Sequence, residues 1–268
     1  MIKRLKPLNP LLSCFLVKNS NSIANLRPKS FRFYNQSTKF SSSSYNNGEN
    51  DDDCGYDFGY TIDFTPESIE LIRDRLKSSG KLNYKFTYDT TKKIEEAAVL
   101  MPLCVVDGKP SVLFTIRSLN LKTHTGEVSF PGGKKESTDA SLESTALRET
   151  CEEIGISPSQ IDVLGKDSTL PNKDRTIKVY PFVGFIKHPI DIKKVNFNKD
   201  EVYGVFSVTL KDLLNKDKRR LERFRDSKIK YPIFETPKEI GLEIWGLTAF
   251  ILESACITQA SESSFEKK

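Results

Sequence analysis

The sequence has few of the residues on which nucleophilic hydrolases depend. Its 268 residues include only two histidines, and neither a Gly-x-Ser-x-Gly segment nor a P-loop pattern occurs. A serine or cysteine hydrolase that relies on a histidine base is therefore disfavoured. A phosphate cradle of the P-loop type is also excluded.

Long apolar runs and paired cysteines are missing as well. No stretch reaches the roughly 18 apolar residues that a membrane span needs, so we expect no membrane span. The five cysteines are far apart and form no Cys-x-x-Cys pair: Cys14, Cys54, Cys104, Cys151 and Cys256. This spacing favours free thiols in a reducing compartment and disfavours both a disulfide framework and a zinc site.

Acidic residues are absent from residues 1–48, which are rich in serine and contain eight Lys or Arg residues. The whole chain has a formal charge of +5, whereas residues 49–268 carry −3. The basic balance therefore belongs to the N-terminal segment, and we expect no nucleic-acid partner. This composition is typical of a mitochondrial transit peptide, which predicts a mitochondrial protein, most simply one of the matrix. A secretory signal is the alternative, because residues 11–17 are a short apolar run interrupted by Ser13 and Cys14.

We expect three parts: a targeting segment at residues 1–48, a flexible polar linker at 49–59 and one folded domain at 60–260. Thr65 and Pro66 predict the cap and first residue of a helix that ends at Gly80. Further along the chain we expect strands at residues 97–106, 111–118, 161–170, 177–186 and 203–210, a turn at 107–110 and a final helix at 244–256. A short strand enters a Gly-Gly loop at residues 132–133. Strands on both sides of a helix predict an α/β domain, with a mixed sheet between helices.

Residues 148–155 read "RETCEEIG" and place three glutamates on one predicted helix. Glu149, Glu152 and Glu153 occur at i, i+3 and i+4, so they share about one third of the helix circumference. An apolar stripe of Leu147, Cys151 and Ile154 is expected to pack against the domain, with the acids on the opposite face. Gly155 should end the helix.

Clustered carboxylates repel one another unless something positive lies between them. A solvated acidic face is one interpretation of the octapeptide. The preceding glycines, Gly132 and Gly133, favour another, because they allow the backbone to approach a ligand closely. Hard cations such as Mg²⁺ prefer oxygen ligands, so the loop and the helix together predict a metal site.

The same residues resemble the Nudix box, in which a glycine is followed by a glutamate and then by Arg-Glu-aliphatic-x-Glu-Glu-x-Gly. Gly133 begins the match, and residues 148–156 match the second half in register. The interval from Gly133 to Arg148 is one residue longer than the pattern. Ala140 stands at the position of the first glutamate, counted back from Arg148, with Asp139 beside it. Asp139 is expected either to substitute for that glutamate or to cap the helix, and Thr150 replaces the aliphatic residue.

The upstream segment "LFTIRSLNLKTHTGEVSFPGG" resembles a signature of the coenzyme A diphosphatase branch of the Nudix hydrolases. The matching positions are Leu113, Thr115, Arg117, Ser118, Gly126 and residues 130–133, and Lys122 stands where arginine is usual. The resemblance implies the Nudix fold, an α/β/α arrangement, and hydrolysis of coenzyme A or acyl-coenzyme A. The implied products are 3′,5′-ADP and (acyl-)4′-phosphopantetheine.

The resemblance also implies residue roles and a Mg²⁺ or Mn²⁺ cofactor. Glu152, Glu153 and the carbonyl of Gly132 would hold the metal, and Glu149 would be a further ligand or the general base. Arg148 would orient these carboxylates, and Glu201 is an alternative base.

The remaining implied site is for the small-molecule substrate, which Arg117, Lys122, His124, Gly132 and Gly133 would bind. Cations between the predicted hairpin and the Gly-Gly loop are suited to the phosphates of coenzyme A. Other substrates such as ADP-ribose or NADH, or a binding module without turnover, are the alternatives. The sequence does not indicate an oligomeric state.

Overall fold

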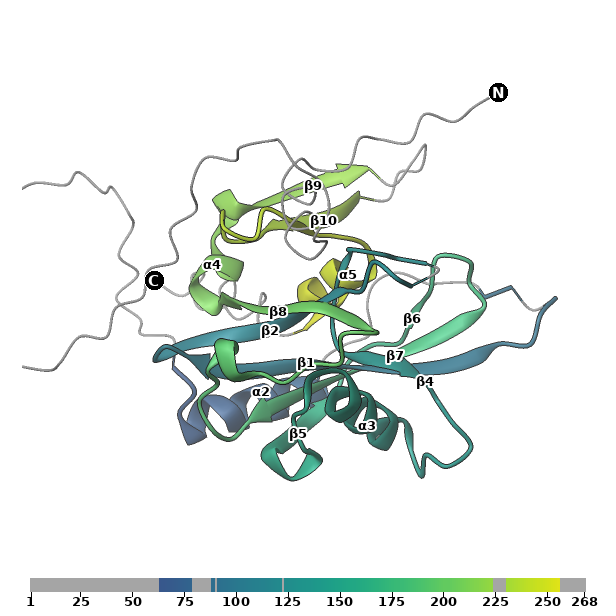
Figure 1. Cartoon of the computed structure of the whole chain (residues 1–268), viewed down its shortest axis with the longest axis horizontal. Helices are drawn as coiled ribbons and strands as arrows, with labels where there is room; N and C mark the ends of the chain where they lie inside the picture. The colour runs from purple at the N-terminus through teal and green to yellow at the C-terminus, as the bar shows by residue number, and fades with distance from the viewer. Residues whose placement is uncertain (1–62, 79–87, 90, 122, 224–229, 256–268) are drawn as a thin grey trace, which may run out of the picture. The chain divides into compact units, whose positions relative to one another are not determined.

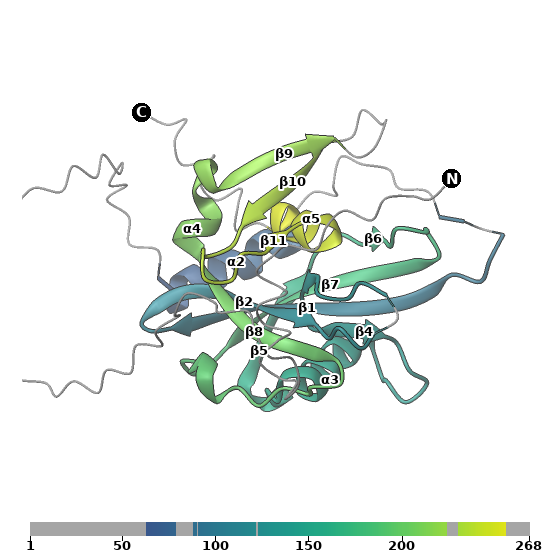
Figure 2. The same ribbon diagram turned by 45° about the horizontal axis from the view of Figure 1, so that its top comes forward.

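The computed structural model describes residues 63–78, 88–89, 91–121, 123–223 and 230–255 (Figures 1 and 2). All of them belong to the unit Tyr60–Lys268. The N-terminal targeting segment, the linker at residues 49–59, the predicted helix end at Gly80 and Lys122 lie outside these residues.

The predicted hairpin is confirmed as strands β1 (Glu95–Val106) and β2 (Lys109–Arg117). Its turn is tighter than expected, because only Asp107 and Gly108 lie between the strands, with φ of 49° and 72°. Positive φ at both central residues matches the twist of an antiparallel pair. Lys109 and Pro110 therefore pair within the ladder, opposite Val106 and Val105.

A mixed sheet forms around β1, as predicted. β7 (Ile177–Ile186) pairs with β1 in parallel, whereas the other named strand pairs are antiparallel. The strand order is β3-β2-β1-β7-β5, where β3 is Val128–Ser129 and β5 is Ile161–Lys166. β8 (Val202–Thr209) pairs with β2, and β6 (Leu170–Pro171) pairs with β7.

The Gly-Gly segment is a strand, which corrects the expectation of a loop. β4 (Gly132–Lys134) pairs with β1, with Gly133 opposite Ala98 and Gly132 opposite Val99. The pairing compensates for the weak strand propensity of glycine, because each backbone group that it buries is hydrogen-bonded.

Helix α2 (Pro66–Ser78) begins where the sequence predicted, and the Thr65 hydroxyl accepts a hydrogen bond from the Ser68 N–H at 3.2 Å. The other helices are α3 (Leu142–Ile154), the short α4 (Leu210–Leu214) and α5 (Gly246–Ser254). Three single-turn 3₁₀ segments, Pro158–Gln160, Ile192–Lys194 and Lys216–Lys218, connect elements. None of the helices among the described residues has the length and apolar character of a membrane span.

A second, three-stranded antiparallel sheet was not predicted. It has the order β11-β10-β9, formed by β9 (Arg219–Arg223), β10 (Lys230–Glu235) and β11 (Glu243–Ile244). Phe234 of β10 and Ile244 of β11 are buried in the core, so this sheet closes over α5. The charged sequence of β9 carries no alternating apolar signal, which is why the sequence did not reveal the sheet.

Two hydrophobic clusters cover the opposite faces of the main sheet, with α3 on one side and α5 on the other (Figures 1 and 2). Along β1, Met101 and Leu103 belong to the α5 cluster, whereas Leu100 and Cys104 belong to the α3 cluster. This alternation is the period of a strand that is buried on both faces.

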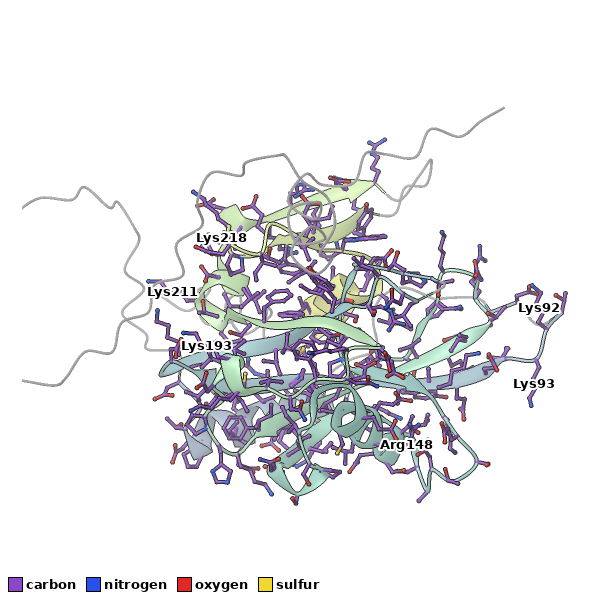
Figure 3. All side chains as sticks on the ribbon, viewed as in Figure 1. Lys92, Lys93, Arg148, Lys193, Lys211 and Lys218 are labelled. Carbon is purple, nitrogen blue, oxygen red and sulfur yellow. The ribbon has the colours of Figure 1, made fainter. Side chains whose placement is uncertain are left out.

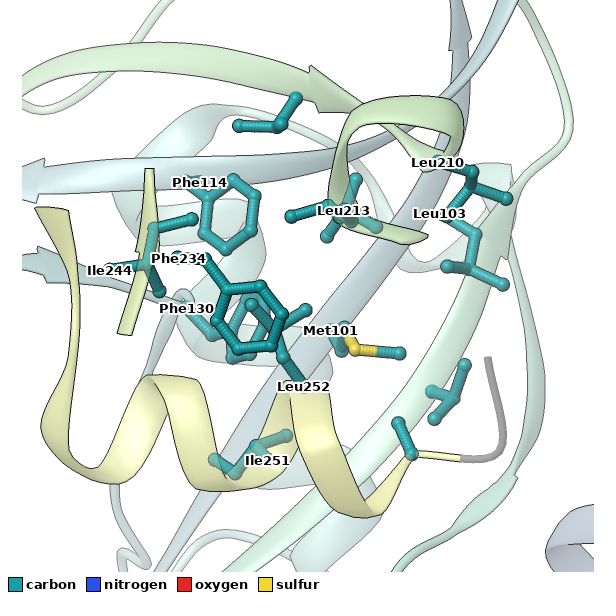
Figure 4. Packing of buried hydrophobic residues seen from close by; sticks show 14 of the residues in the cluster. Met101, Leu103, Phe114, Phe130, Leu210, Leu213, Phe234, Ile244, Ile251 and Leu252 are labelled. Atoms are coloured by element: carbon teal, nitrogen blue, oxygen red, sulfur yellow. The ribbon is translucent and has the colours of Figure 1, made fainter. Parts of the chain in front are cut away.

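Figure 4 shows the α5 cluster, in which Phe114 of β2 packs between strands and helix. The Phe114 ring stacks with Phe130, with centroids 5.1 Å apart, and with Phe206, with centroids 5.5 Å apart. The predicted arrangement, a mixed sheet between helices, is confirmed.

Candidate active site

Helix α3 has well-defined ends. The side chain of Ser141 caps the first turn by accepting from the Ser144 N–H, and the Ser144 hydroxyl accepts from the Ser141 N–H in return. Gly155 ends the helix with a left-handed φ of 69°, as predicted, and a Cβ there would lie 2.6 Å from the Asn196 carbonyl oxygen. A fixed start and end define which side of the helix each glutamate occupies.

The packed face of α3 differs from the predicted one. Cys151 is exposed, and the buried residues are Thr145, Ala146, Thr150, Glu153 and Ile154. Thr150 is accommodated because its hydroxyl donates to the Ala146 carbonyl at 2.7 Å. The glutamates therefore do not share one solvent-facing surface: Glu153 points inward, Glu149 is half-buried and Glu152 is exposed.

Glu153 is a buried carboxyl group, with only 5% of the residue exposed. Burial is the main cause that raises its pKa to about 8; Arg117 acts against the shift, and the nearby Glu149 and Glu201 carboxylates contribute to it. A backbone hydrogen bond from Gly132 also lowers it. Around Glu153, the positive charge of Arg117 does not offset burial and the nearby carboxylates, so Glu153 keeps its proton to a higher pH than an exposed glutamate.

Gly133 and Glu149 are packed so closely that a side chain at position 133 would displace the Glu149 carboxylate. A Cβ at position 133 would lie 2.3 Å from a carboxylate oxygen of Glu149, and one at 132 would lie 2.4 Å from the Ala98 carbonyl oxygen. Gly132 also has a φ of 153°, which other residues rarely adopt. Desolvation by this packing raises the pKa of Glu149, while Arg148 acts in the opposite direction.

Arg148, labelled in Figure 3, forms ion pairs with several carboxylates of the site. Its Nη1 lies 2.8 Å from Glu152 Oε2 and 3.0 Å from Glu149 Oε1. Its Nε and Nη2 bind the two oxygens of Asp139 at 2.9 and 3.0 Å, and Nη2 reaches the Lys134 carbonyl at 3.3 Å. The guanidinium thus joins β4, the following loop and α3.

Asp139 anchors this arginine and does not cap the helix, since Ser141 is the cap. Its side chain is 4% exposed and also accepts from the Thr145 hydroxyl and the Glu136 N–H. Hydrogen bonding from Arg148 holds the pKa of Asp139 well below its usual range. In the Nudix box, five residues separate the glycine from the first glutamate, and in this chain five residues separate Gly133 from Asp139. Spacing measured forward from Gly133 therefore identifies Asp139, whereas spacing measured back from Arg148 gives Ala140.

Arg117 and Glu201 come to the site from neighbouring strands. The Ser118 N–H, next to Arg117, donates to the Glu201 carbonyl at 2.8 Å. Arg117 Nε is buried and has no hydrogen-bond partner among the described residues. An unpartnered buried donor beside carboxylates is well suited to an anionic ligand. Glu201 itself is exposed.

His124 lies in the loop after β2. Its Nδ1 is 2.8 Å from Glu127 Oε2, and its backbone has a positive φ of 57°. Gly126 closes the same loop, because its N–H donates to the Arg117 carbonyl at 3.0 Å. His124 therefore lies in the same loop that follows Arg117. The interaction of its ring among the described residues is with Glu127 and not with a carboxylate of α3.

The donor chemistry of the site fits a hard divalent cation, since it consists of carboxylate and backbone oxygens. A metal would also relieve the repulsion around Glu153. Within the described part of the chain, however, no group of three or more His, Cys, Asp or Glu side chains is already arranged to hold a metal. Glu149 and Glu152 face Arg148, so binding would require these carboxylates to turn.

A mixed-sheet α/β domain with clustered glutamates beside a glycine strand offers the oxygen donors that metal-assisted phosphohydrolases use. The profile of the NUDIX domain matches residues 95–227. Human "Mitochondrial coenzyme A diphosphatase NUDT8" is 39% identical over 196 residues, which cover 69% of this chain and 80% of the human protein. The chain belongs to the Nudix hydrolase family, whose members act on diphosphate bonds and generally use divalent cations.

Other proteins are similar too. "Nudix hydrolase 3" of Caenorhabditis elegans is 35% identical over 172 residues, covering 59% of this chain and 70% of its own length. Among solved structures, a C. elegans Ap4A hydrolase complex aligns with a TM-score of 0.41 and 17% identity, covering 64% of this chain and all of that one.

Replacing Asp139 by Asn should destabilise the domain and reduce activity, because Arg148 loses its charged anchor. We expect a loss of about 2 kcal/mol in the free energy of unfolding and a fall in kcat/KM of at least about tenfold. Urea unfolding and steady-state kinetics would measure both. Asp174→Asn, at an exposed loop position, is the matched control; equal effects of the two changes would contradict the anchoring role.

The metal-free protein should lose stability as the pH rises. Because the pKa of Glu153 is about 8 when folded against an ordinary value of 4.5, the folded state holds this proton more tightly. Its stabilisation is therefore fully present below about pH 4.5 and is lost by pH 8 to 9. Thermal unfolding at pH 6 and pH 9 should show a smaller drop in Tm for Glu153→Gln than for wild type. Glu143→Gln, on the exposed first turn of α3, should show the same drop in Tm as wild type. If Glu153→Gln also shows the wild-type drop in Tm, the assignment of the pH dependence to Glu153 is refuted.

Proposed function

We propose that this protein hydrolyses the diphosphate bond of coenzyme A or acyl-coenzyme A, using Mg²⁺ or Mn²⁺. The products are 3′,5′-ADP and 4′-phosphopantetheine, or its acyl form. The observation that carries the proposal is the similarity to the human mitochondrial coenzyme A diphosphatase, which extends over 80% of that protein's length. The mouse protein of the same name is 37% identical over 163 residues.

The geometry supports anion binding beside the carboxylates. Arg117 has a buried Nε without a partner among the described residues, and its charge faces Glu153. A diphosphate supplies the acceptor oxygens that this guanidinium lacks. Arg117 also lies within the upstream segment that resembles the coenzyme A diphosphatase signature. Lys122, in the same segment, is a further candidate for phosphate binding outside the described residues.

Glu152, Glu153 and the Gly132 carbonyl are the proposed metal ligands, with Glu149 as a further ligand or the base. When bound, the cation neutralises diphosphate charge and lowers the pKa of the attacking water. The water oxygen bonds to one phosphorus, the bridging P–O bond breaks, and a carboxylate accepts the proton of water. Glu149 is half-buried, and burial raises its pKa above that of a free glutamate, which makes it a stronger base; Glu201 is the alternative.

Arg148 is proposed to position these carboxylates and not to touch the substrate. Its N–H groups are shared among Asp139, Glu149, Glu152 and the Lys134 carbonyl. When a cation takes the carboxylates, Asp139 keeps the guanidinium in place. Two other candidates remain: hydrolysis of a different nucleoside diphosphate derivative, such as ADP-ribose or NADH, and binding without turnover.

The full chain incubated with coenzyme A and Mg²⁺ or Mn²⁺ should yield 3′,5′-ADP and phosphopantetheine by mass spectrometry. Glu153→Gln should reduce the rate by at least about a hundredfold, because it removes a proposed ligand charge. Glu143→Gln, on an exposed turn of the same helix, should retain activity.

Parallel reactions with ADP-ribose and NADH separate the alternatives. If these are cleaved while coenzyme A stays intact, the proposed substrate is wrong. If nothing is cleaved in the presence of either metal, the binding module becomes the better explanation.

We further propose a mitochondrial location, because residues 1–48 have the composition of a transit peptide and similar human and mouse proteins are named mitochondrial. Residues 1–59 fused to a fluorescent protein should direct it to mitochondria. The same fusion with its eight Lys and Arg residues changed to Gln should stay outside, because import depends on the basic charge. Delivery to the secretory pathway would contradict the proposal.

A further inference from the structure

The chain's single tryptophan is exposed although the residue before it is buried. Trp245 is 44% exposed at the cap position of α5, whereas Ile244 before it is fully buried and Thr248 after it is 8% exposed. The indole does not cap the helix. No aromatic ring or cation from the described residues packs against it. A large apolar surface is thus left open to solvent at a rigid position.

The start of α5 is attached to the strand beside Arg117. The Thr248 hydroxyl donates to the Val128 carbonyl of β3 at 3.1 Å, and β11 contacts β3. Val128 pairs with Ile116, and the next residue, Arg117, donates its N–H to the Glu127 carbonyl at 3.0 Å. One short strand therefore separates the tryptophan's segment from the candidate phosphate-binding arginine.

The hydrophobic core gives a second link to the site. Ile244 and Phe130 belong to the same cluster (Figure 4), and Gly132 of the site follows Phe130 by two residues. The backbone between them is fixed, because the Leu100 N–H donates to the Pro131 carbonyl at 2.9 Å. The segment that carries Trp245 therefore lies on the α5 side of the strands that carry Arg117 and Gly132, the side opposite to α3.

We propose that Trp245 stacks on the purine base of the nucleotide substrate. The inference rests on the proposed function only in so far as the substrate is an adenine nucleotide derivative. Every base has a π face, and stacking on an aromatic side chain stabilises binding without hydrogen-bond readout. The diphosphate then lies at Arg117 and the α3 carboxylates, with the base on the other side of β3.

A base fits this surface better than an acyl chain does. The other large apolar residues in the exposed class are Leu71 on α2 and Leu221 on β9, whereas Leu242 and Leu247, on the segment of the indole, are packed partly against the core. An acyl chain requires a groove lined by several apolar side chains. A flat ring requires only one face of the indole, which is what the structure provides.

The single tryptophan makes the test direct, because all tryptophan fluorescence comes from residue 245. Titration of the metal-free full chain with 3′,5′-ADP or AMP should quench this fluorescence in a saturable way. Phosphopantetheine, which lacks a base, should not. Saturable quenching by phosphopantetheine but not by the nucleotides would overturn the proposal, because the indole would then contact the other half of the substrate.

Kinetics provide a second measurement that does not depend on fluorescence. Trp245→Ala should raise KM about tenfold, the effect of losing one stacked base, with kcat within about twofold because chemistry occurs elsewhere. Trp245→Phe should restore most of the affinity. Leu221→Ala, which removes another exposed apolar side chain, is the matched control and should leave KM unchanged.

Thermal unfolding of each variant excludes a folding defect, and Trp245→Phe keeps the test valid if the alanine variant is unstable. An unchanged KM in folded Trp245→Ala, with no quenching by nucleotides, would overturn the stacking role. Quenching by AMP in a protein that leaves coenzyme A intact would refute the proposed substrate while supporting the stacked base. The two proposals can therefore fail separately.

Discussion

The ion pair between Asp139 and Arg148 is the interaction on which the site depends. Both oxygens of the carboxylate bind the guanidinium, and the side chain of Asp139 is almost fully buried. A second N–H group of Arg148 then faces Glu149 and Glu152. Because an arginine presents its donors in a rigid fork, fixing one edge also directs the other. The pair thus connects the loop after β4 to α3 and determines where two of the three helix glutamates point.

Close backbone approach is the second requirement, and it explains the glycines. β4 can lie between β1 and Glu149 only because residues 132 and 133 have no Cβ, which would overlap Ala98 on one side and Glu149 on the other. The same packing removes water from Glu149 and Glu153 and raises the pKa of both. Burial of a charged carboxylate without matched positive charge is costly, so the free protein favours the protonated form of Glu153. A bound cation would reverse this cost, which makes the site's instability a feature that favours metal binding.

Much of the fold followed from pattern, because the hairpin, β7 and the C-terminal end of α3 carry strong local signals such as the Asp-Gly turn and the terminal Gly155. The orientation of α3 did not follow from the pattern. The stripe of Leu147, Cys151 and Ile154 is more apolar than the face that is actually buried, which includes Thr150 and Glu153. Thr150 satisfies its hydroxyl within the helix and Glu153 is charged only in the appropriate environment, and neither effect is visible in hydropathy. Likewise, β9 is charged and β11 is two residues long, so only tertiary packing defines their sheet.

The segment from Val128 to Gly133 crosses from one face of the sheet to the other. Phe130 packs into the cluster with α5, and Gly133 lies against Glu149 of α3. An extended substrate that lies across this crossing meets the α3 carboxylates on one side and the start of α5 on the other. In this arrangement, α3 would cleave the diphosphate bond and the start of α5 would recognise the rest of the substrate. A change near Trp245 can alter which molecules bind without disturbing Arg148, whereas a change in α3 alters the reaction itself. With the proposed stacking at Trp245, the position of β3 and β4 between the two helices would let one site combine diphosphate cleavage with a separate selection of substrate.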